Sequence, residues 1–204
     1  MAENFDRFRR FLRGMTGLCD AGADETDLRV EGGALLRDLV AFDDWLPSEF
    51  GAPDPAGYRQ YLLHCDPLER FSVVSFVWGP GQRTPVHDHT VWGLIGMLRG
   101  SEIARNYTAE PCGLLAMTGT DELVPGEVTA VSPTIGDIHQ VANALRDRPS
   151  ISIHVYGGNI GAVARHVFVP ETGEIKPFVS GYSNRVLPNL WDRSDAVRAR
   201  LVAA

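Results

Sequence analysis

The sequence predicts a mainly β protein, a jelly-roll β-barrel that carries a helical layer at its N-terminal end. From about Tyr58, short β-rich runs cut by Gly, Pro or Asn turns follow one another without helical patterns between them. The preceding residues place apolar side chains at spacings of three and four, which is typical of amphipathic helices. With 204 residues, 44% of them hydrophobic, the chain can form one sizeable core.

Two helices are expected in the N-terminal part. The first spans residues 4–15, and its apolar stripe consists of Phe5, Phe8, Phe11, Leu12 and Met15. The second spans residues 26–42 with Thr26 as candidate N-cap. Its buried side is expected to consist of Leu28, Leu35, Leu36 and Leu39. A Pro-containing segment over residues 43–58 then ends the helical part.

The predicted strands lie within seven β-rich runs, which indicate an antiparallel barrel. These runs are residues 70–82, 84–100, 101–109, 126–133, 138–145, 150–158 and 165–175. Because no internal repeat or linker divides the chain, we expect a single domain over residues 1–204. It comprises a helical layer (1–57), a β-barrel (58–180) and a C-terminal tail (181–204) that ends in a short helix.

Composition excludes several classes of partner. The formal net charge of -7 disfavours nucleic acids and anionic membranes, and no apolar run approaches the roughly 20 residues of a membrane span. The N-terminus lacks the apolar region and cleavage site of a secretion signal. Three widely separated cysteines, Cys19, Cys65 and Cys112, do not form a disulfide framework. We therefore expect a cytoplasmic protein that binds neither nucleic acid nor membrane, while its oligomeric state stays unassigned.

Three histidines form the main candidate site. In PVHDHTVWGLIGMLRG, residues 85–100, His87 and His89 are one residue apart, so a strand would direct both imidazoles to one face and Asp88 to the other. A stable divalent metal site needs a third ligand, and His139, on a later β-run just after a glycine turn, is the best candidate. The glycines that flank both histidine blocks, together with the matching downstream His139, favour metal ligation over ordinary surface or core histidines.

A second candidate set lies in residues 150–158. Ser152, His154 and Tyr156 alternate with aliphatic residues, so one strand face is protic and the other apolar. The plain alternative is an edge strand with a solvated face. Three protic groups in line can instead form a hydrogen-bond relay in which His154 holds the Tyr156 hydroxyl. We favour the relay because the predicted metal site belongs to the same barrel.

These motifs together resemble the thiol dioxygenases, the cysteine dioxygenase family within the cupin superfamily of small β-barrels. HDHT, GDIHQVAN, SISIHVY and FVWGPGQ carry the resemblance, which extends over nearly the whole chain. Such enzymes hold Fe(2+) with three histidines and add both atoms of dioxygen to a thiol, giving a sulfinic acid. The resemblance implies that His87, His89 and His139 hold iron and that the protic set around His154 is catalytic. Iron fits oxygen chemistry better than zinc because zinc has no redox activity.

Gly93 departs from the patterns of related families. Most cupins carry a glutamate ligand at this position, whereas mammalian-type cysteine dioxygenases carry a cysteine that is cross-linked to the active-site tyrosine. A glycine leaves three neutral ligands and three open positions on an octahedral ion, enough for a substrate that chelates through two atoms and for dioxygen. It also implies that Tyr156 keeps a free phenol.

The candidate substrate-binding residues are Gln60 and Arg165. Where relatives place an arginine for the substrate carboxylate, this chain has Gln60, and Arg165 is a second candidate partner. This pattern, without the cross-link, is similar to the bacterial 3-mercaptopropionate dioxygenase branch. It implies a small thiol-carboxylate without an amine as substrate, together with dioxygen, and 3-sulfinopropionate as product. An ordinary surface arginine is the alternative for Arg165.

Two other functions stay open. The nearer one is cysteine dioxygenation, from L-cysteine to cysteine sulfinate, with Arg165 replacing the missing arginine. The more distant one is a non-catalytic metal-binding cupin or a cupin isomerase that uses Zn or Mn. The protic set and the three histidines disfavour this second class.

Overall fold

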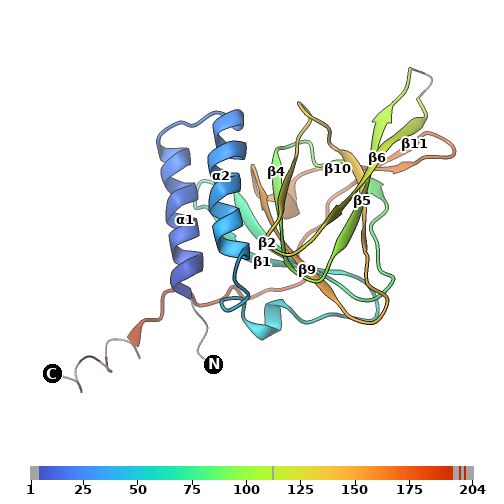
Figure 1. Ribbon diagram of the computed structural model, residues 1–204. Coiled ribbons are helices and arrows are strands. Elements are labelled where there is room, and N and C mark those ends of the chain that lie inside the picture. The colour runs from blue at the N-terminus through green and yellow to red at the C-terminus, as the bar shows by residue number, and fades with distance from the viewer. Residues whose placement is uncertain (1–4, 112, 195–197, 199, 201–204) are drawn as a thin grey trace.

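Two antiparallel sheets enclose a common interior, and two N-terminal helices cover the outside of one sheet (Figure 1). The computed structural model describes residues 5–111, 113–194, 198 and 200. The helices are α1 (Phe5–Asp20) and α2 (Glu25–Val40), with short 3-10 helices at Ser48–Phe50 and Ile160–Ala162. The strands are β1 (Arg59–Cys65), β2 (Ser72–Trp78), β3 (Val86–His87), β4 (Gly93–Arg99), β5 (Glu102–Ala109), β6 (Leu115–Leu123), β7 (Val128–Val131), β8 (Ile138–Asn143), β9 (Ser150–Tyr156), β10 (Arg165–Val169) and β11 (Glu174–Phe178).

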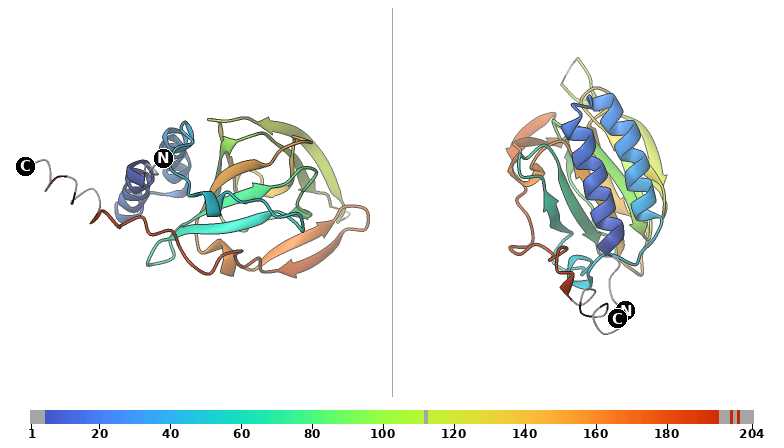
Figure 2. Two further views of the ribbon diagram at one scale, coloured as in Figure 1. Left: turned by 90° about the horizontal axis from the view of Figure 1, so that it is seen from below. Right: turned by 90° about the vertical axis from the view of Figure 1, so that its left-hand side faces the viewer.

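The strand order is that of a jelly roll. The five-stranded sheet has the order β1-β2-β9-β4-β7, and the six-stranded sheet has the order β11-β10-β3-β8-β5-β6. The chain passes repeatedly from one sheet to the other, so strands that are neighbours in space come from distant parts of the sequence. Seen from below, the sheets curve around their shared interior (Figure 2). The expected mainly β jelly roll with an N-terminal helical layer is confirmed.

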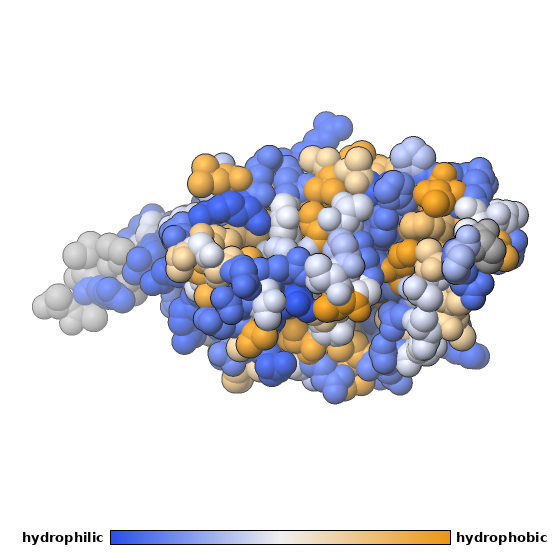
Figure 3. All heavy atoms as spheres, turned by 90° about the horizontal axis from the view of Figure 1, so that it is seen from above, coloured by the Kyte–Doolittle hydropathy of each residue, from blue (hydrophilic) through white to orange (hydrophobic). Residues whose placement is uncertain are grey.

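The helices lie side by side on the outer face of the five-stranded sheet (Figure 2). Met15 of α1 and Leu36 of α2 are fully buried, and they belong to one apolar cluster with Leu94 and Ile153 of the sheet. The predicted apolar stripes are therefore the faces that pack on the barrel. Over the face seen from above, hydrophilic and apolar residues are interspersed (Figure 3), as expected for a surface in contact with water.

The N-cap of α2 differs from the prediction. The helix begins at Glu25, and the Asp24 carboxylate accepts a hydrogen bond of 3.0 Å from the backbone N–H of Asp27. Thr26 therefore lies inside the first turn and is not the cap. Aspartate and threonine both cap helices well, so residue type alone does not distinguish Asp24 from Thr26, two positions further along.

Several strand predictions also need correction. The run 84–100 is divided into β3 and β4 by a loop, and the run 165–175 into β10 and the start of β11 by a turn. β1 and β6 lie in none of the predicted runs. β6 lies at the edge of its sheet, pairs with β5 alone and has no buried residue, so it lacks the apolar alternation that reveals a strand.

Parts of the sequence-based interpretation lie outside the described residues. These parts are Cys112 and most of the expected C-terminal helix, residues 195–197, 199 and 201–204. Cys19 and Cys65 are free, half-buried thiols. Among the residues that the structure describes, no helix has the length and apolar character needed to cross a membrane.

Close packing of α2 on β4 predicts a cost for any side chain at Gly96. A Cβ added there would lie 2.9 Å from Leu36 Cγ and 3.0 Å from Val40 Cγ1. We expect Gly96→Val to lower the free energy of unfolding by about 1–3 kcal/mol in a urea titration, because the helix must move away from the sheet.

Gly119→Val is the matched control, since this strand glycine has nothing within 4 Å of its added Cβ. If both variants unfold at the same urea concentration as the parent protein, the helical layer is not packed as described.

Candidate functional site

The three predicted histidines meet in the barrel interior. His87 of β3 faces His139 of β8 in the antiparallel register, and His89 completes the set. Each pair of imidazole centroids is 4.9 Å apart, and all three residues are buried. One potential ligand atom from each residue lies within 4.8 Å of the other two. We call these residues the three-histidine group.

His89 reaches this group from a loop and not from a strand, which corrects the prediction. β3 ends at His87, and Thr90 has a left-handed backbone with φ of 61°. The Asp137 carboxylate holds the loop by accepting hydrogen bonds from the backbone N–H of His89 (3.0 Å) and of Thr90 (2.8 Å). It also accepts one from the His89 ring at Nδ1 (2.9 Å). Burial raises the pKa of Asp137, but these hydrogen bonds outweigh it and keep the pKa below the usual value.

The donor atoms of the three-histidine group fit a divalent metal ion. Burial lowers the pKa of His87 to about 3 and that of His139 well below its usual value, so both imidazoles are neutral and keep a lone pair. His87 Nδ1 lies 3.1 Å from the Pro85 carbonyl oxygen, which leaves Nε2 for a ligand. His89 Nε2 is buried without a hydrogen-bond partner among the described residues. A metal ion would satisfy this buried atom, with Asp137 orienting the ring from behind.

A second set of residues, which we call the protic triad, consists of Ser152, His154 and Tyr156. Ser152 Oγ lies 2.8 Å from His154 Nε2, and the Tyr156 hydroxyl lies 2.7 Å from His154 Nδ1. All three belong to β9, which is buried along its whole length between β2 and β4. The edge-strand alternative is therefore wrong. The Tyr156 and His89 rings stack at 5.4 Å, which places the triad beside the three-histidine group.

Gly93 allows the Tyr156 ring to occupy its position. The two residues face each other across β4 and β9. A Cβ at residue 93 would lie 2.9 Å from Tyr156 Cδ1 and 3.0 Å from Val131 Cγ2. Burial raises the pKa of Tyr156, so the hydroxyl remains protonated at neutral pH. Tyr156 is thus an uncharged phenol, and residue 93 has no side chain that could form a covalent bond to it.

A cavity of about 120 Å³ joins both predicted substrate-binding residues to the three-histidine group. Its lining mixes aromatic and polar side chains with one cation and contains no acidic residue. The lining residues are Tyr58, Gln60, Phe76, Thr84, Pro85, His87, Arg165, Val167, Phe178 and Ser180. We call this space the Arg165 cavity.

Arg165 is a buried cation with free hydrogen-bonding capacity. Its exposed fraction is 3%, so the surface-arginine alternative is wrong. One terminal N–H donates to Ser180 Oγ at 2.6 Å, and the guanidinium lies over the Phe178 ring at 4.6 Å. Nε is buried without a hydrogen-bond partner among the described residues. Burial lowers the pKa of Arg165, so an anion in the cavity would stabilise the charged form.

Gln60 lines the same cavity, but neither of its amide hydrogens is free to bind a substrate. Its Nε2 donates to Ser180 Oγ at 3.0 Å and to the Gly181 carbonyl at 2.9 Å. An amide nitrogen has two hydrogens, and both are used inside the protein. Gln60 therefore positions Ser180, which also accepts a hydrogen bond from Arg165, and the guanidinium is left as the group that can bind an anion.

Sequence reasoning did not single out Asp137 or Ser180. Asp137 stands two residues before His139, inside a motif that carried the resemblance, and a carboxylate so placed is a common orienting partner of a metal-bound histidine. Ser180 has no such signal, because its contacts arise only when the segment after β11 folds against β1. The remaining histidines are not in the group: His166 pairs with Asp88 at 2.7 Å, and His64 packs on Phe71.

Comparison with known proteins identifies a family. The family described as cysteine dioxygenase type I matches residues 43–178. Among solved structures, the TT1209 protein from Thermus thermophilus is 19% identical, with a TM-score of 0.43, over 54% of this chain and 92% of that one. An uncharacterised protein with a double-stranded β-helix domain from Klebsiella pneumoniae is also 19% identical, with a TM-score of 0.44, over 56% and 89%. An oxalate oxidase in complex with glycolate is 17% identical, with a TM-score of 0.41, over 52% and 53%.

The unpartnered Nε2 of His89 predicts that this residue is needed for metal binding. We expect His89→Ala to retain clearly less metal than the parent protein when both are loaded with one equivalent of a divalent ion and desalted. The reason is that two imidazoles hold such an ion far less tightly than three. Elemental analysis measures the bound metal, and thermal unfolding confirms that the variant is folded.

His64→Ala is the control, because it removes an imidazole that lies outside the group. Parent-level metal in His89→Ala would contradict the assignment.

Proposed function

This chain belongs to the cysteine dioxygenase type I family, and from that premise we propose that it is an iron(II)-dependent dioxygenase that converts 3-mercaptopropionate to 3-sulfinopropionate. The thiolate sulfur gains two S–O bonds while the O–O bond breaks, so both atoms of dioxygen end in the sulfinate and no other reductant is needed. Iron held by the three-histidine group would supply the redox activity that this reaction requires.

The chain's own histidines act as neutral ligands in this proposal. Because burial keeps His87 and His139 uncharged, the ion would retain its full positive charge, which favours an anionic thiolate. Asp137 would fix the ring of His89 and leave Nε2 for the ion. Gly93 offers no side chain as a further ligand, and the Tyr156 ring fills the space beside it, so the ion would keep open positions for substrate and dioxygen.

The observation that carries the substrate assignment is the buried, incompletely bonded guanidinium of Arg165. A carboxylate in the cavity would satisfy Nε and gain a charge-assisted hydrogen bond away from bulk water. No acidic side chain lines the cavity, so the ammonium group of L-cysteine would lie near a cation without a counter-charge. A thiol-carboxylate without an amine matches this distribution of charge.

The protic triad holds the Tyr156 hydroxyl next to the site. His154 fixes the phenol oxygen by a 2.7 Å hydrogen bond, and Phe76 covers the His154 ring at 4.3 Å between centroids. The hydroxyl is protonated at neutral pH and can orient a substrate oxygen or a water by hydrogen bonding.

The charge of the cavity predicts a preference between two thiols. We expect kcat/KM for 3-mercaptopropionate to exceed that for L-cysteine by at least about tenfold. The reason is that the ammonium group of bound L-cysteine would have no counter-charge in the cavity. Oxygen-electrode kinetics on the iron-loaded protein measure both values, and ethanethiol, which lacks the carboxylate, serves as the control substrate. A higher kcat/KM for L-cysteine would contradict the substrate assignment.

Arg165→Met is expected to raise KM for 3-mercaptopropionate by about ten- to a hundredfold, because it removes a hydrogen bond between charged groups while keeping an unbranched apolar stem. Steady-state kinetics measure KM, and elemental analysis is expected to show unchanged iron.

The matched control is Arg59→Met on the same cavity-flanking strand as Gln60, since Arg59 pairs with Asp54 and does not line the cavity. An unchanged KM in Arg165→Met would mean that the carboxylate is held by another group.

A further inference from the structure

Two cavities reach the three-histidine group, and their linings have no residue in common. The Arg165 cavity reaches the group at His87, whereas a cavity of about 430 Å³ reaches it at His139. Asp137, which orients His89, also lines the larger space. The strand order β10-β3-β8-β5-β6 places the Arg165 cavity on the β10 side of the group and the larger cavity on the β5 and β6 side. We call the larger space the His139 cavity.

The His139 cavity opens between β6 and β7, the edge strands of the two sheets. Asp121 of β6 and Thr129 of β7 both line it and are exposed. From Asp121 the strand register leads inward to Ala104 of β5 and then to Val141 of β8. Val141 is buried and lies on the same face of β8 as His139, two residues away. The cavity therefore extends from the surface to the three-histidine group.

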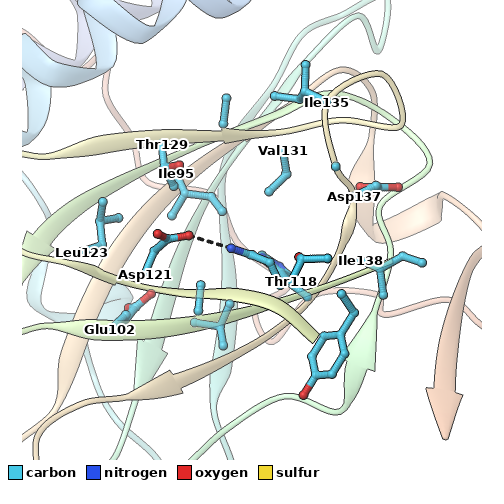
Figure 4. A pocket seen from close by; sticks show the side chains of 17 residues that line it. Ile95, Glu102, Thr118, Asp121, Leu123, Thr129, Val131, Ile135, Asp137 and Ile138 are labelled. Carbon is cyan, nitrogen blue, oxygen red and sulfur yellow. Dashed lines mark hydrogen bonds between the residues drawn. The ribbon is translucent and has the colours of Figure 1, made fainter. Parts of the chain in front are cut away.

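Buried aliphatic side chains contribute to the inner wall of the His139 cavity. Ile95 and Val131 lie on one side of the space, and Asp121 and Glu102 lie on the other (Figure 4). Dioxygen is uncharged and apolar, so it is more stable in apolar surroundings than in water. Apolar cavities in proteins bind small apolar molecules such as xenon for the same reason. The inner part of this cavity is therefore suited to dioxygen.

The charged groups of the two cavities are opposite in sign. The described residues that line the His139 cavity include three carboxyl groups, those of Glu102, Asp121 and Asp137, and no lysine or arginine. The Arg165 cavity has a guanidinium and no acidic residue. Carboxylates repel an anionic thiol-carboxylate but leave the entry of an uncharged gas unaffected. The two cavities are thus suited to different molecules.

The size of the Arg165 cavity requires a second way in. Its volume of about 120 Å³ corresponds to about four water molecules in the liquid, so one molecule of 3-mercaptopropionate would fill it. A molecule that extends from Arg165 to His87 then obstructs this side of the group. A second reactant must arrive from another side while the first is bound, and the His139 cavity stays open.

We propose that dioxygen reaches the three-histidine group through the His139 cavity, while the thiol-carboxylate enters and occupies the Arg165 cavity. This inference rests on the proposed function, because it assigns one route to each of the two reactants. Ala104 keeps the dioxygen route wide, since its small side chain lies between Asp121 at the opening and Val141 next to His139.

Dioxygen itself is the probe in the first test. It is paramagnetic, so it speeds the relaxation of methyl protons that it approaches. The protein is loaded with zinc, which has no redox activity, and methyl NMR spectra are recorded under dioxygen and under nitrogen. We expect several-fold greater enhancement at Ile95, Val131 and Val141 than at Val73 and Leu36, which are buried beneath the helices and do not line the cavity. Equal enhancement of the two sets of methyl groups overturns the proposal.

The second test narrows the route at Ala104. Ala104→Leu leaves every residue of the Arg165 cavity unchanged. In the iron-loaded protein it is expected to lower kcat/KM for dioxygen at least about tenfold, because the added side chain must move aside for each molecule. KM for 3-mercaptopropionate and the iron content are expected to stay at the parent values. Oxygen-electrode kinetics at varied dioxygen concentration measure the first constant.

Ala142→Leu is the matched control. The same substitution is made on the opposite face of β8 from Val141, where residue 142 is paired with Ile103 and lines neither cavity. It is expected to leave both constants unchanged. A raised KM for 3-mercaptopropionate in Ala104→Leu, with kcat/KM for dioxygen unchanged, would mean that the thiol uses the His139 cavity and overturns the proposal.

The two tests separate this inference from the proposed function. The expected relaxation pattern without any thiol-dependent oxygen uptake retains the His139 cavity as a dioxygen route but contradicts the proposed reaction. Conversion of 3-mercaptopropionate to the sulfinate with equal relaxation of all buried methyl groups supports the reaction and overturns the route. The relaxation measurement uses the parent protein, so it decides the question even if Ala104→Leu does not fold.

Discussion

The hydrogen bonds that Asp137 makes to His89 are the constraint on which the site depends. β3 has only two residues, and the chain leaves it before His89, so strand geometry alone does not bring this imidazole to His87 and His139. One carboxylate fixes both the loop backbone and the ring, and it directs Nε2 into the barrel. The group then combines one loop ligand with two ligands whose positions follow from the pairing of β3 with β8.

The two sheets contribute different parts of the proposed chemistry. The six-stranded sheet brings together two of the histidines and Arg165, and the five-stranded sheet holds the protic triad on its central strand. The stacked rings of His89 and Tyr156 join the two parts. Because β9 is buried along its whole length, its polar residues need partners inside the protein, and His154 supplies them for Ser152 and Tyr156.

Local patterns in the sequence were sufficient for the class of fold, the two helices and the membership of the three-histidine group, because each follows from a period of 2 or 3.6 residues or from the spacing of histidines. Features set by distant parts of the chain were not predictable in this way. The amide of Gln60 is engaged by the segment after β11, and Arg165 of β10 donates to Ser180 of the same segment. β6 was not predicted because an edge strand with no buried residue has no alternation of apolar and polar side chains.

The central claim is that a thiol-carboxylate and dioxygen react at the three-histidine group to give a sulfinate. The most direct measurement is mass spectrometry of the product formed by the iron-loaded protein from 3-mercaptopropionate under ¹⁸O-labelled dioxygen. We expect both oxygen atoms of the sulfinate group to carry the label, with one dioxygen consumed for each thiol. A product with one labelled oxygen or none, or a disulfide in place of the sulfinate, would contradict the claim.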